Sequence, residues 1–200
     1  MKDKFIEIYK ENIRRPGAEK LLTWLESSDF FEAPASTRFH LSRPGGLVEH
    51  SIHVYERLSN LVADEEGYPG STFGEDFTIS DETIAICGLL HDICKANFYT
   101  VEMRNRKNEQ GQWEKYPFYV VDDQLPYGHG EKSVYIISGF MKLTREEAIA
   151  IRWHMGFSDN DFKAGGFSVG NAFEKFPLVV LTHIADLQAT YLDEVDDEEG

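Results

Sequence analysis

The chain contains little cysteine, no long apolar run, and few cations for its number of acids. Its two cysteines, Cys87 and Cys94, would lie about 10 Å apart if one helix carried both, which is too far for a disulfide. We therefore expect reduced thiols in a cytoplasmic protein. Zinc-finger spacing is absent, no apolar stretch approaches the roughly 20 residues of a membrane span, and residues 1–5 lack the apolar core of a signal peptide. These absences argue against a disulfide scaffold, a zinc finger and a membrane protein.

Acidic residues outnumber basic ones, 35 against 20, and the formal net charge is −15. This charge opposes the binding of a long polyanion over a broad surface, so we do not expect a long nucleic acid as partner. Part of the excess lies in residues 193–200, which we expect to fray into solvent as an acidic tail. A small phosphorylated substrate is compatible with the charge, because bound metals and a few local cations set the field inside a pocket.

Residues 1–192 are expected to form a single domain, since 200 residues with 13% aromatic residues can bury a substantial core. Apolar residues at helical spacing predict helices over 2–13, 18–26, 47–63, 83–95, 131–141, 144–154 and 177–190. Residues 156–175 are predicted to be a long loop. Residues 97–123 differ, because two runs of β-forming residues, 98–104 and 113–121, predict a β-hairpin insertion. The sequence leaves open whether this hairpin is a lid or is simply solvated.

The most informative stretch is residues 83–95, which are apolar nearly all round until they end in His91, Asp92 and Lys95. A helix of this kind belongs in the centre of a domain. Titratable groups at its end are costly to bury unless they are paired or bind a metal. His91 and Asp92 would lie about 100° apart on the helix, so both can flank one ion, and Lys95 returns to the face of Asp92. The alternative is a solvated His-Asp-Lys cluster at an ordinary helix end.

Four further groups repeat this pattern of an imidazole or carboxylate within or at the end of a helix: His50, His129, His154 and Asp186. Imidazole and carboxylate ligands suit Mn, Fe, Co, Ni or Zn, and one carboxylate can bridge two ions. A single histidine on an apolar face is more often a satisfied core residue than a ligand. Six such groups, counting the His-Asp pair, are hard to explain one by one, so together they indicate a metal centre.

The motifs around these residues resemble those of the HD superfamily of metal-dependent phosphohydrolases. The matching stretches are Gly45–His50, Leu89–Lys95, His129–Ser133 and Ala185–Asp186, within a resemblance that covers residues 30–190. The run from Ala33 through His40 to His50 looks like the HD domain of bacterial 3′→5′ exoribonucleases. His129 and His154 match the six-ligand dinuclear branch. The resemblance implies an all-α HD-domain helical bundle, with the hairpin of residues 97–123 as a small insertion.

The resemblance also assigns roles to single residues. Six would bind one or two divalent transition metals (Mn, Fe, Ni, Co or Zn): His50, His91, Asp92, His129, His154 and Asp186. Asp92 would bridge the two ions, with His129 and His154 holding the second. A water activated by the metal would attack the phosphorus of a nucleotide or another small phosphate ester. Lys95 and Asp92 would be the catalytic residues, with Lys95 binding a phosphate oxygen.

Further residues are candidates for contacts with substrate or for positions behind the ligands: Arg38, His40, Arg43, His53, Lys132, Arg152 and His183. The arginines and Lys132 could contact phosphate, and His183, one turn before Asp186, could orient a ligand. Two alternatives to a phosphohydrolase remain: a diiron oxygenase of the same superfamily, which shares the six ligands, and a non-catalytic HD domain that senses a nucleotide. The sequence predicts neither the identity of the substrate nor the oligomeric state.

Overall fold

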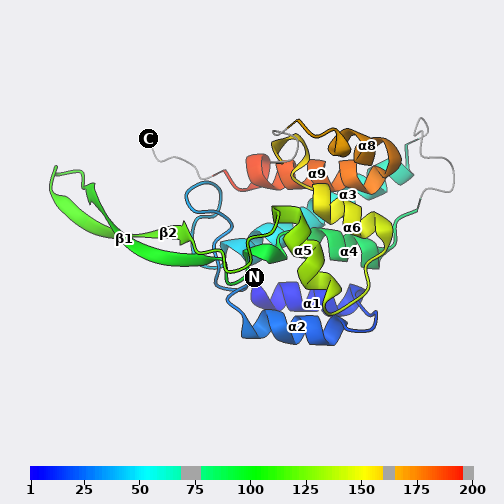
Figure 1. The fold of residues 1–200 in the computed structure, drawn as a ribbon, viewed down its shortest axis with the longest axis horizontal. Coiled ribbons are helices and arrows are strands. Elements are labelled where there is room, and N and C mark those ends of the chain that lie inside the picture. Colours follow the sequence, from blue (N-terminus) through cyan, green and yellow to red (C-terminus); the bar gives the residue numbers. More distant parts are fainter. Residues whose placement is uncertain (69–77, 160–164, 196–200) are drawn as a thin grey trace.

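The computed structural model describes residues 1–68, 78–159 and 165–195 (Figure 1). Over these ranges the chain forms eight α-helices and one two-stranded sheet, which confirms the predicted all-α bundle with a hairpin. None of these helices is both long and apolar enough to span a membrane. In chain order the helices are α1 (Lys2–Asn12), α2 (Ala18–Ser27), α3 (Gly46–Glu66), α4 (Asp81–Leu90), α5 (His129–Ser138), α6 (Arg145–Trp153), α8 (Ser168–Lys175) and α9 (Pro177–Gln188).

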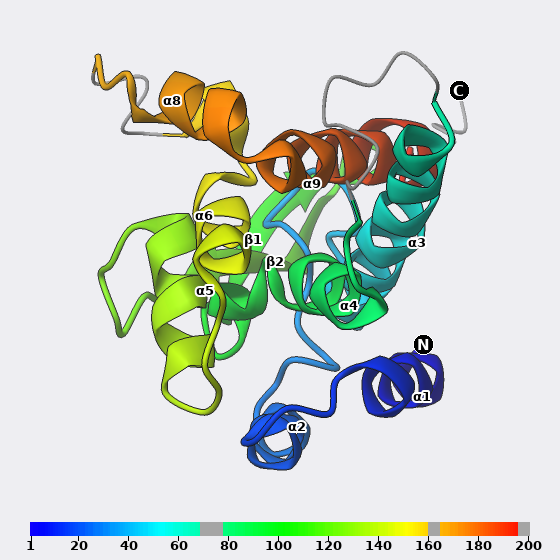
Figure 2. The same ribbon diagram turned by 90° about the vertical axis from the view of Figure 1, so that its right-hand side faces the viewer.

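The central element is α4, which lies between α3 and α6, with α1 and α9 on its other sides (Figure 2). Its residues from Ile84 to Leu90 are all buried, as expected for a helix that is apolar nearly all round. Ser80 caps its start by accepting a hydrogen bond from the Thr83 amide. Gly88 allows α3 to approach closely, because a Cβ there would lie 2.5 Å from Tyr55 Cα. This close contact brings the histidines of α3 and α4 together.

The helix predicted over residues 83–95 is not continuous. It ends at Leu90, Asp92 leaves the helical conformation with φ −106° and ψ 18°, and a 3₁₀ turn follows over Ile93–Lys95. The prediction missed the break because apolar periodicity continues through the turn. Cys87 and Cys94 therefore lie on different elements, and both are free and buried.

The N-terminal helices pack on the bundle through an aromatic cluster in which the ring centroid of Phe5 lies 5.2 Å from that of Phe30. The predicted capping box of α6 is present, with Thr144 and Glu147 each bonding to the other's backbone amide. Arg15, in the turn between α1 and α2, also pairs with Glu147 at 2.8 Å and with Glu82 of α4 at 3.2 Å. Arg15 thus connects the turn between α1 and α2 with the N-terminal ends of α4 and α6. The candidate ligands that these two helices carry lie at their opposite, C-terminal ends.

The long loop predicted over residues 156–175 is wrong for its second half, where Ser168–Lys175 forms α8. Val169 and Ala172 are its buried residues. The helix is short, and the glycines before and within it, Gly165 and Gly170, hid its apolar spacing in the sequence. Residues 160–164 lie outside the described ranges.

The predicted hairpin consists of β1 (Tyr99–Lys107) and β2 (Trp113–Val121), paired antiparallel with Arg104 opposite Tyr116. It projects from the helical body as a long arm, and β1 is exposed after its first residue (Figure 1). Cations cover its aromatic rings: the guanidinium of Arg104 lies 3.7 Å from the ring centre of Phe118. The outward direction of the arm favours a solvated hairpin over a lid.

The acidic tail predicted over residues 193–200 is wrong for its first two residues. A π-helical turn, Ala189–Asp193, continues α9, and Asp193 pairs with Arg57 of α3. Glu194 follows with its side chain fully buried. The acidic composition predicted that both side chains would be solvated. In the structure, Asp193 pairs with Arg57 and Glu194 contacts two imidazoles, all on α3. Residues 196–200 lie outside the described ranges.

Candidate metal centre

Six side chains converge in the body from five segments of the chain. They are His50 from α3, His91 and Asp92 from the end of α4, His129 from the start of α5, His154 from the end of α6 and Asp186 from α9. Four overlapping groups among the described residues have possible ligand atoms within 4.8 Å of one another: His40 with His50 and Glu194, His50 with His91 and Asp186, His91 with Asp92 and His154, and Asp92 with Cys94 and His129. The structure thus places together all six residues that the sequence singled out as ligands.

Asp92 lies at the centre of this set. Its Oδ1 is 2.8 Å from His129 Nε2 and 3.4 Å from His154 Nε2. Its Oδ2 is 3.6 Å from His91 Nε2, 3.7 Å from His50 Nε2 and 2.6 Å from Lys95 Nζ. Each oxygen therefore faces a different pair of imidazoles, which is the arrangement that a bridging carboxylate requires.

His50 occupies the inner side of the set. Its Nε2 lies 3.3 Å from Asp186 Oδ1 and 3.2 Å from His91 Nε2. Its Nδ1 lies 3.0 Å from Oε1 of Glu194, a residue that the sequence analysis did not select. The imidazoles of His50 and His91 are fully buried, whereas the Asp186 side chain is 15% exposed.

The donor geometry fits a cation. His154 donates from Nδ1 to the carbonyl of Ile151 at 2.7 Å, which leaves its buried Nε2 as an acceptor without a hydrogen-bond partner in the described part of the chain. His91 donates likewise to the Gly88 carbonyl at 2.9 Å. Both Nε2 lone pairs face oxygens of Asp92, and acceptors that face each other in a buried site are unfavourable unless a cation lies between them. Imidazoles and carboxylates are suitable ligands for Mn, Fe, Co, Ni or Zn.

Protonation states agree with this fit. Burial lowers the pKa of His91 to about 3, so the imidazole is neutral and able to bind a metal. Burial also lowers the pKa of His50, but hydrogen bonds to Asp186 and Glu194 outweigh it and raise the pKa to about 9. For His129, burial is again outweighed, here by Cys94 and Asp92, and the pKa rises to about 10. In the metal-free protein, two imidazoles thus hold protons beside carboxylates, where a divalent ion would displace them.

Lys95 and Asp92 form an ion pair at the edge of the set. Burial raises the pKa of Asp92, but the charge of Lys95 and the charge and hydrogen bond of His129 outweigh it and hold that pKa well below its ordinary value. Burial lowers the pKa of Lys95, and Asp92 more than compensates, so the ammonium stays charged. The 3₁₀ turn after α4 places the two side chains together, with Lys95 donating its amide to the Asp92 carbonyl.

Three of the additional histidines predicted at the site lie beside the ligands. His40 stacks on His50 with ring centres 5.0 Å apart, and its buried Nε2 has no hydrogen-bond partner among the described residues. Burial lowers the pKa of His40 to about 4. His183 donates from Nδ1 to the His154 carbonyl at 2.6 Å, and His53 lies 2.9 Å from Glu194. His183 and His53 are thus placed behind the ligands.

The four predicted phosphate-binding cations have partners other than the ligands. Arg43 pairs with Glu49 at 2.6 Å. Lys132 lies 2.5 Å from Asp123, and Arg152 lies 3.0 Å from Asp159 as well as pairing with Glu131. Arg38 is exposed, with its guanidinium 5.0 Å from the ring centre of Phe39. Lys95 is therefore the cation that the structure places directly against the candidate centre.

Neither Glu194 nor the contact of Cys94 with the centre was predicted from the sequence. Cys94 Sγ lies 3.3 Å from His129 Nδ1, and its place in the 3₁₀ turn, two residues after Asp92, was a usable signal. Glu194 had no local signal, because 144 positions separate it from His50 and it stands in a run of acids.

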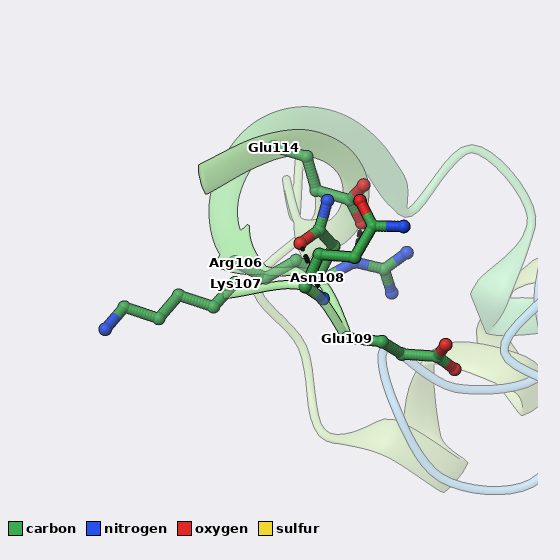
Figure 3. Close-up of a pocket in the computed structure, with 6 residues that line it drawn as sticks. Arg106, Lys107, Asn108, Glu109 and Glu114 are labelled. Atoms are coloured by element: carbon green, nitrogen blue, oxygen red, sulfur yellow. Dashed lines mark hydrogen bonds and ion pairs between the residues drawn. The ribbon is translucent and has the colours of Figure 1, made fainter. Parts of the chain in front are cut away.

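A separate hollow lies at the tip of the hairpin, lined by Arg106, Lys107, Asn108, Glu109, Gln110 and Glu114 (Figure 3). Arg106 and Glu114 neutralise each other across it at 2.6 Å, whereas the Lys107 side chain extends away from the rest. Its side chains belong to one exposed hairpin and contribute none of the six candidate ligands. This hollow therefore has no part in the metal chemistry.

Four imidazoles and two carboxylates, gathered by a helical bundle around Asp92, form a cluster that could hold metal ions. The family model described as HD domain matches residues 47–187, which include all six candidate ligands and Lys95. The chain therefore belongs to the HD-domain family, whose members are mostly metal-dependent hydrolases. The match does not confirm the branch of 3′→5′ exoribonucleases. No curated protein and no solved structure matches the chain significantly.

Proposed function

We propose that this protein is a metal-dependent phosphohydrolase that acts on a nucleotide or another small phosphate ester. The observation that supports this most is the Lys95 ammonium, 2.6 Å from Asp92 Oδ2 at the edge of a cluster of metal-ligand groups. A hydrolase needs a cation for the phosphoryl oxygens in addition to its metals. Neither metal storage nor structural metal binding needs such a lysine.

Bound divalent ions would supply a water that is deprotonated near neutral pH and would polarise a phosphoryl oxygen. The chain's own groups then set the charge of the site. Asp92, Asp186 and the buried Glu194 contribute three negative charges and Lys95 one positive charge, so two divalent ions would make the pocket net positive. A phosphate group is attracted to such a pocket although the whole chain carries −15.

Lys95 acts directly on the substrate in this proposal. If Asp92 held metal, its carboxylate would no longer need the ammonium, and Lys95 would be free to donate hydrogen bonds to a phosphoryl oxygen. Its side chain is 14% exposed, so Lys95 is not fully sealed from solvent. Because these bonds strengthen as negative charge develops on the oxygen, Lys95 stabilises the transition state more than the bound substrate.

His40 contacts the substrate in a different way. Its pKa of about 4 keeps the ring neutral at pH 7, and its Nε2 has no hydrogen-bond partner in the described residues. A neutral imidazole can exchange one hydrogen bond with a hydroxyl or base of the substrate, but it contributes no charge. The strongly acidic composition favours a small substrate over a long nucleic acid.

The test is a phosphate-release screen over nucleotides and small phosphate esters, with Mn²⁺, Fe²⁺, Co²⁺, Ni²⁺ or Zn²⁺, with and without oxygen. We expect oxygen-independent release of phosphate or a nucleotide product, lost on removal of metal by a chelator. Turnover that requires oxygen and Fe²⁺ would contradict the proposal in favour of an oxygenase. Tight nucleotide binding without turnover under every condition would contradict it in favour of a sensor.

A further inference from the structure

A buried carboxylate outside the six candidate ligands touches the centre. The Glu194 side chain is fully buried, with Oε1 3.0 Å from His50 Nδ1 and 2.9 Å from His53 Nδ1. Its Oε2 lies 3.1 Å from the same His50 nitrogen. His50 and His53 stand one turn apart on α3, so one carboxylate joins both to the C-terminal end of the described chain.

The extension of α9 delivers this carboxylate. The π-helical turn Ala189–Asp193 ends α9, and the Glu194 amide donates to the Ala189 carbonyl at 3.1 Å. Arg57 of α3 fixes the turn by donating from Nε to Asp193 Oδ2 at 2.8 Å. The helix that carries Asp186 to one nitrogen of His50 therefore also carries Glu194 to the other nitrogen.

His50 differs in this respect from the other buried imidazoles of the centre. His91 and His154 direct Nδ1 at neutral backbone carbonyls, of Gly88 and Ile151. His50 directs Nδ1 at a carboxylate. A carboxylate behind a metal-binding histidine fixes the Nδ1–H tautomer, aims the Nε2 lone pair at the ion and makes the ring a stronger ligand.

We propose that Glu194 is a positioning residue that holds His50 for the first metal ion, and that the turn Ala189–Asp193 is thereby part of the metal centre. The inference rests on the proposed metal-dependent function. It concerns a residue that composition assigned to a solvated tail. His53 supports the same carboxylate from the solvent side, with its side chain 22% exposed.

The matched variants are Glu194→Gln and Glu7→Gln, which make the same substitution and each lose one negative charge. Metal affinity is measured on the full chain by competition of Mn²⁺ or Co²⁺ with a chromophoric chelator. We expect Glu194→Gln to weaken the first ion about 10–100-fold, as is typical for the partner of a metal-bound histidine. Glu7→Gln should leave affinity near the wild-type value, because Glu7 is exposed on α1, away from the candidate ligands.

A second readout separates positioning from a structural role. In Co²⁺-loaded protein, the His50 Nδ1 proton should give a paramagnetically shifted NMR signal, protected from exchange in the wild type and in Glu7→Gln. The signal should broaden or vanish in Glu194→Gln. Equal affinities and equal spectra for the two variants would overturn the inference, whereas a wild-type protein without metal affinity would instead overturn the proposed function.

Folding is checked by thermal melting in chelator. If Glu194→Gln does not fold, His53→Asn tests the same carboxylate from its other donor. Loss of that donor loosens Glu194 and should weaken the first ion severalfold, with Glu7→Gln again as the control. Affinity unchanged in His53→Asn would then overturn the inference.

Discussion

The two sides of the metal centre differ in how firmly their imidazoles are held. On the inner side, the His50 side chain is 1% exposed and lies between the carboxylates of Asp186 and Glu194. On the outer side, the His129 side chain is 31% exposed, and its Nδ1 faces the thiol of Cys94, a weak hydrogen-bonding partner. His129 also follows Gly128 at the first position of α5, at a helix end rather than within a helix.

This difference predicts an order of events. The inner ligands are preorganised by buried partners, so the first ion should bind tightly and stay. The outer side has an exposed imidazole, so the second ion should exchange faster, and substrate should approach from there. Asp92 links the two sides, because its oxygens face imidazoles on both. The following substitutions test the comparison, beginning with the one expected to remove the most metal.

Asp92→Ala should have the largest effect, because Asp92 contacts imidazoles of both sides. We expect metal content near zero by mass spectrometry, no turnover, and a lower melting temperature, since the Lys95 ammonium loses its partner. Asp3→Asn, an exposed change on α1, is the control for loss of negative charge. Retention of one full ion by Asp92→Ala would show that the two sides bind metal independently.

His129→Ala should remove only the second ion. The first ion should remain with nearly unchanged affinity, because His129 is not among its expected ligands. Metal content should fall to about half of the wild-type value if two ions bind. His91→Ala is the contrasting variant and should lose the first ion. Unchanged metal content in His129→Ala, with only a raised Michaelis constant, would show that His129 binds substrate around a single metal.

Lys95→Ala should remove no metal. The lysine neutralises Asp92 in the metal-free protein, so its loss should leave metal binding intact or strengthen it. Turnover should fall about 10²–10³-fold, the usual loss for one preorganised electrostatic contact. Lys115→Ala, an exposed change on the hairpin, is the control and should be silent. Loss of metal in Lys95→Ala would mean that the lysine supports the ligands and not the substrate.

The sequence predicted the parts of this centre that repeat a local pattern. His91, Asp92 and Asp186 stand out because a polar group in an apolar helix needs a partner, and the capping residue Thr144 has its own signature. Two features escaped. The break after Leu90 depends on how Asp92 is held by the surrounding helices, and Glu194 depends on a contact across 144 positions. Neither the helix break nor the contact of Glu194 can be recognised from the local composition of the sequence.

The phosphate-binding cations were the weakest part of the prediction for the same reason. An arginine near a motif can equally well pair with a neighbouring acid, and this chain has 35 acids for 20 cations. Arg43 and Lys132 follow that rule, with Glu49 and Asp123 as partners. Lys95 is the exception because its partner is itself a candidate metal ligand.

The smallest effect is expected for the hairpin, whose base packs against the helical body. Tyr99 at the start of β1 donates from its hydroxyl to the Ala35 carbonyl at 3.4 Å, while the rest of the arm extends away from the body (Figure 1). Residues 105–115 can be replaced by Asn-Gly, because Arg104 and Tyr116 face each other and a two-residue turn can join them. Metal content should not change, and turnover of a small phosphate ester should stay within about twofold, as for other surface changes. A Michaelis constant raised tenfold or more at unchanged metal content would show instead that the arm covers the open side and acts as a lid.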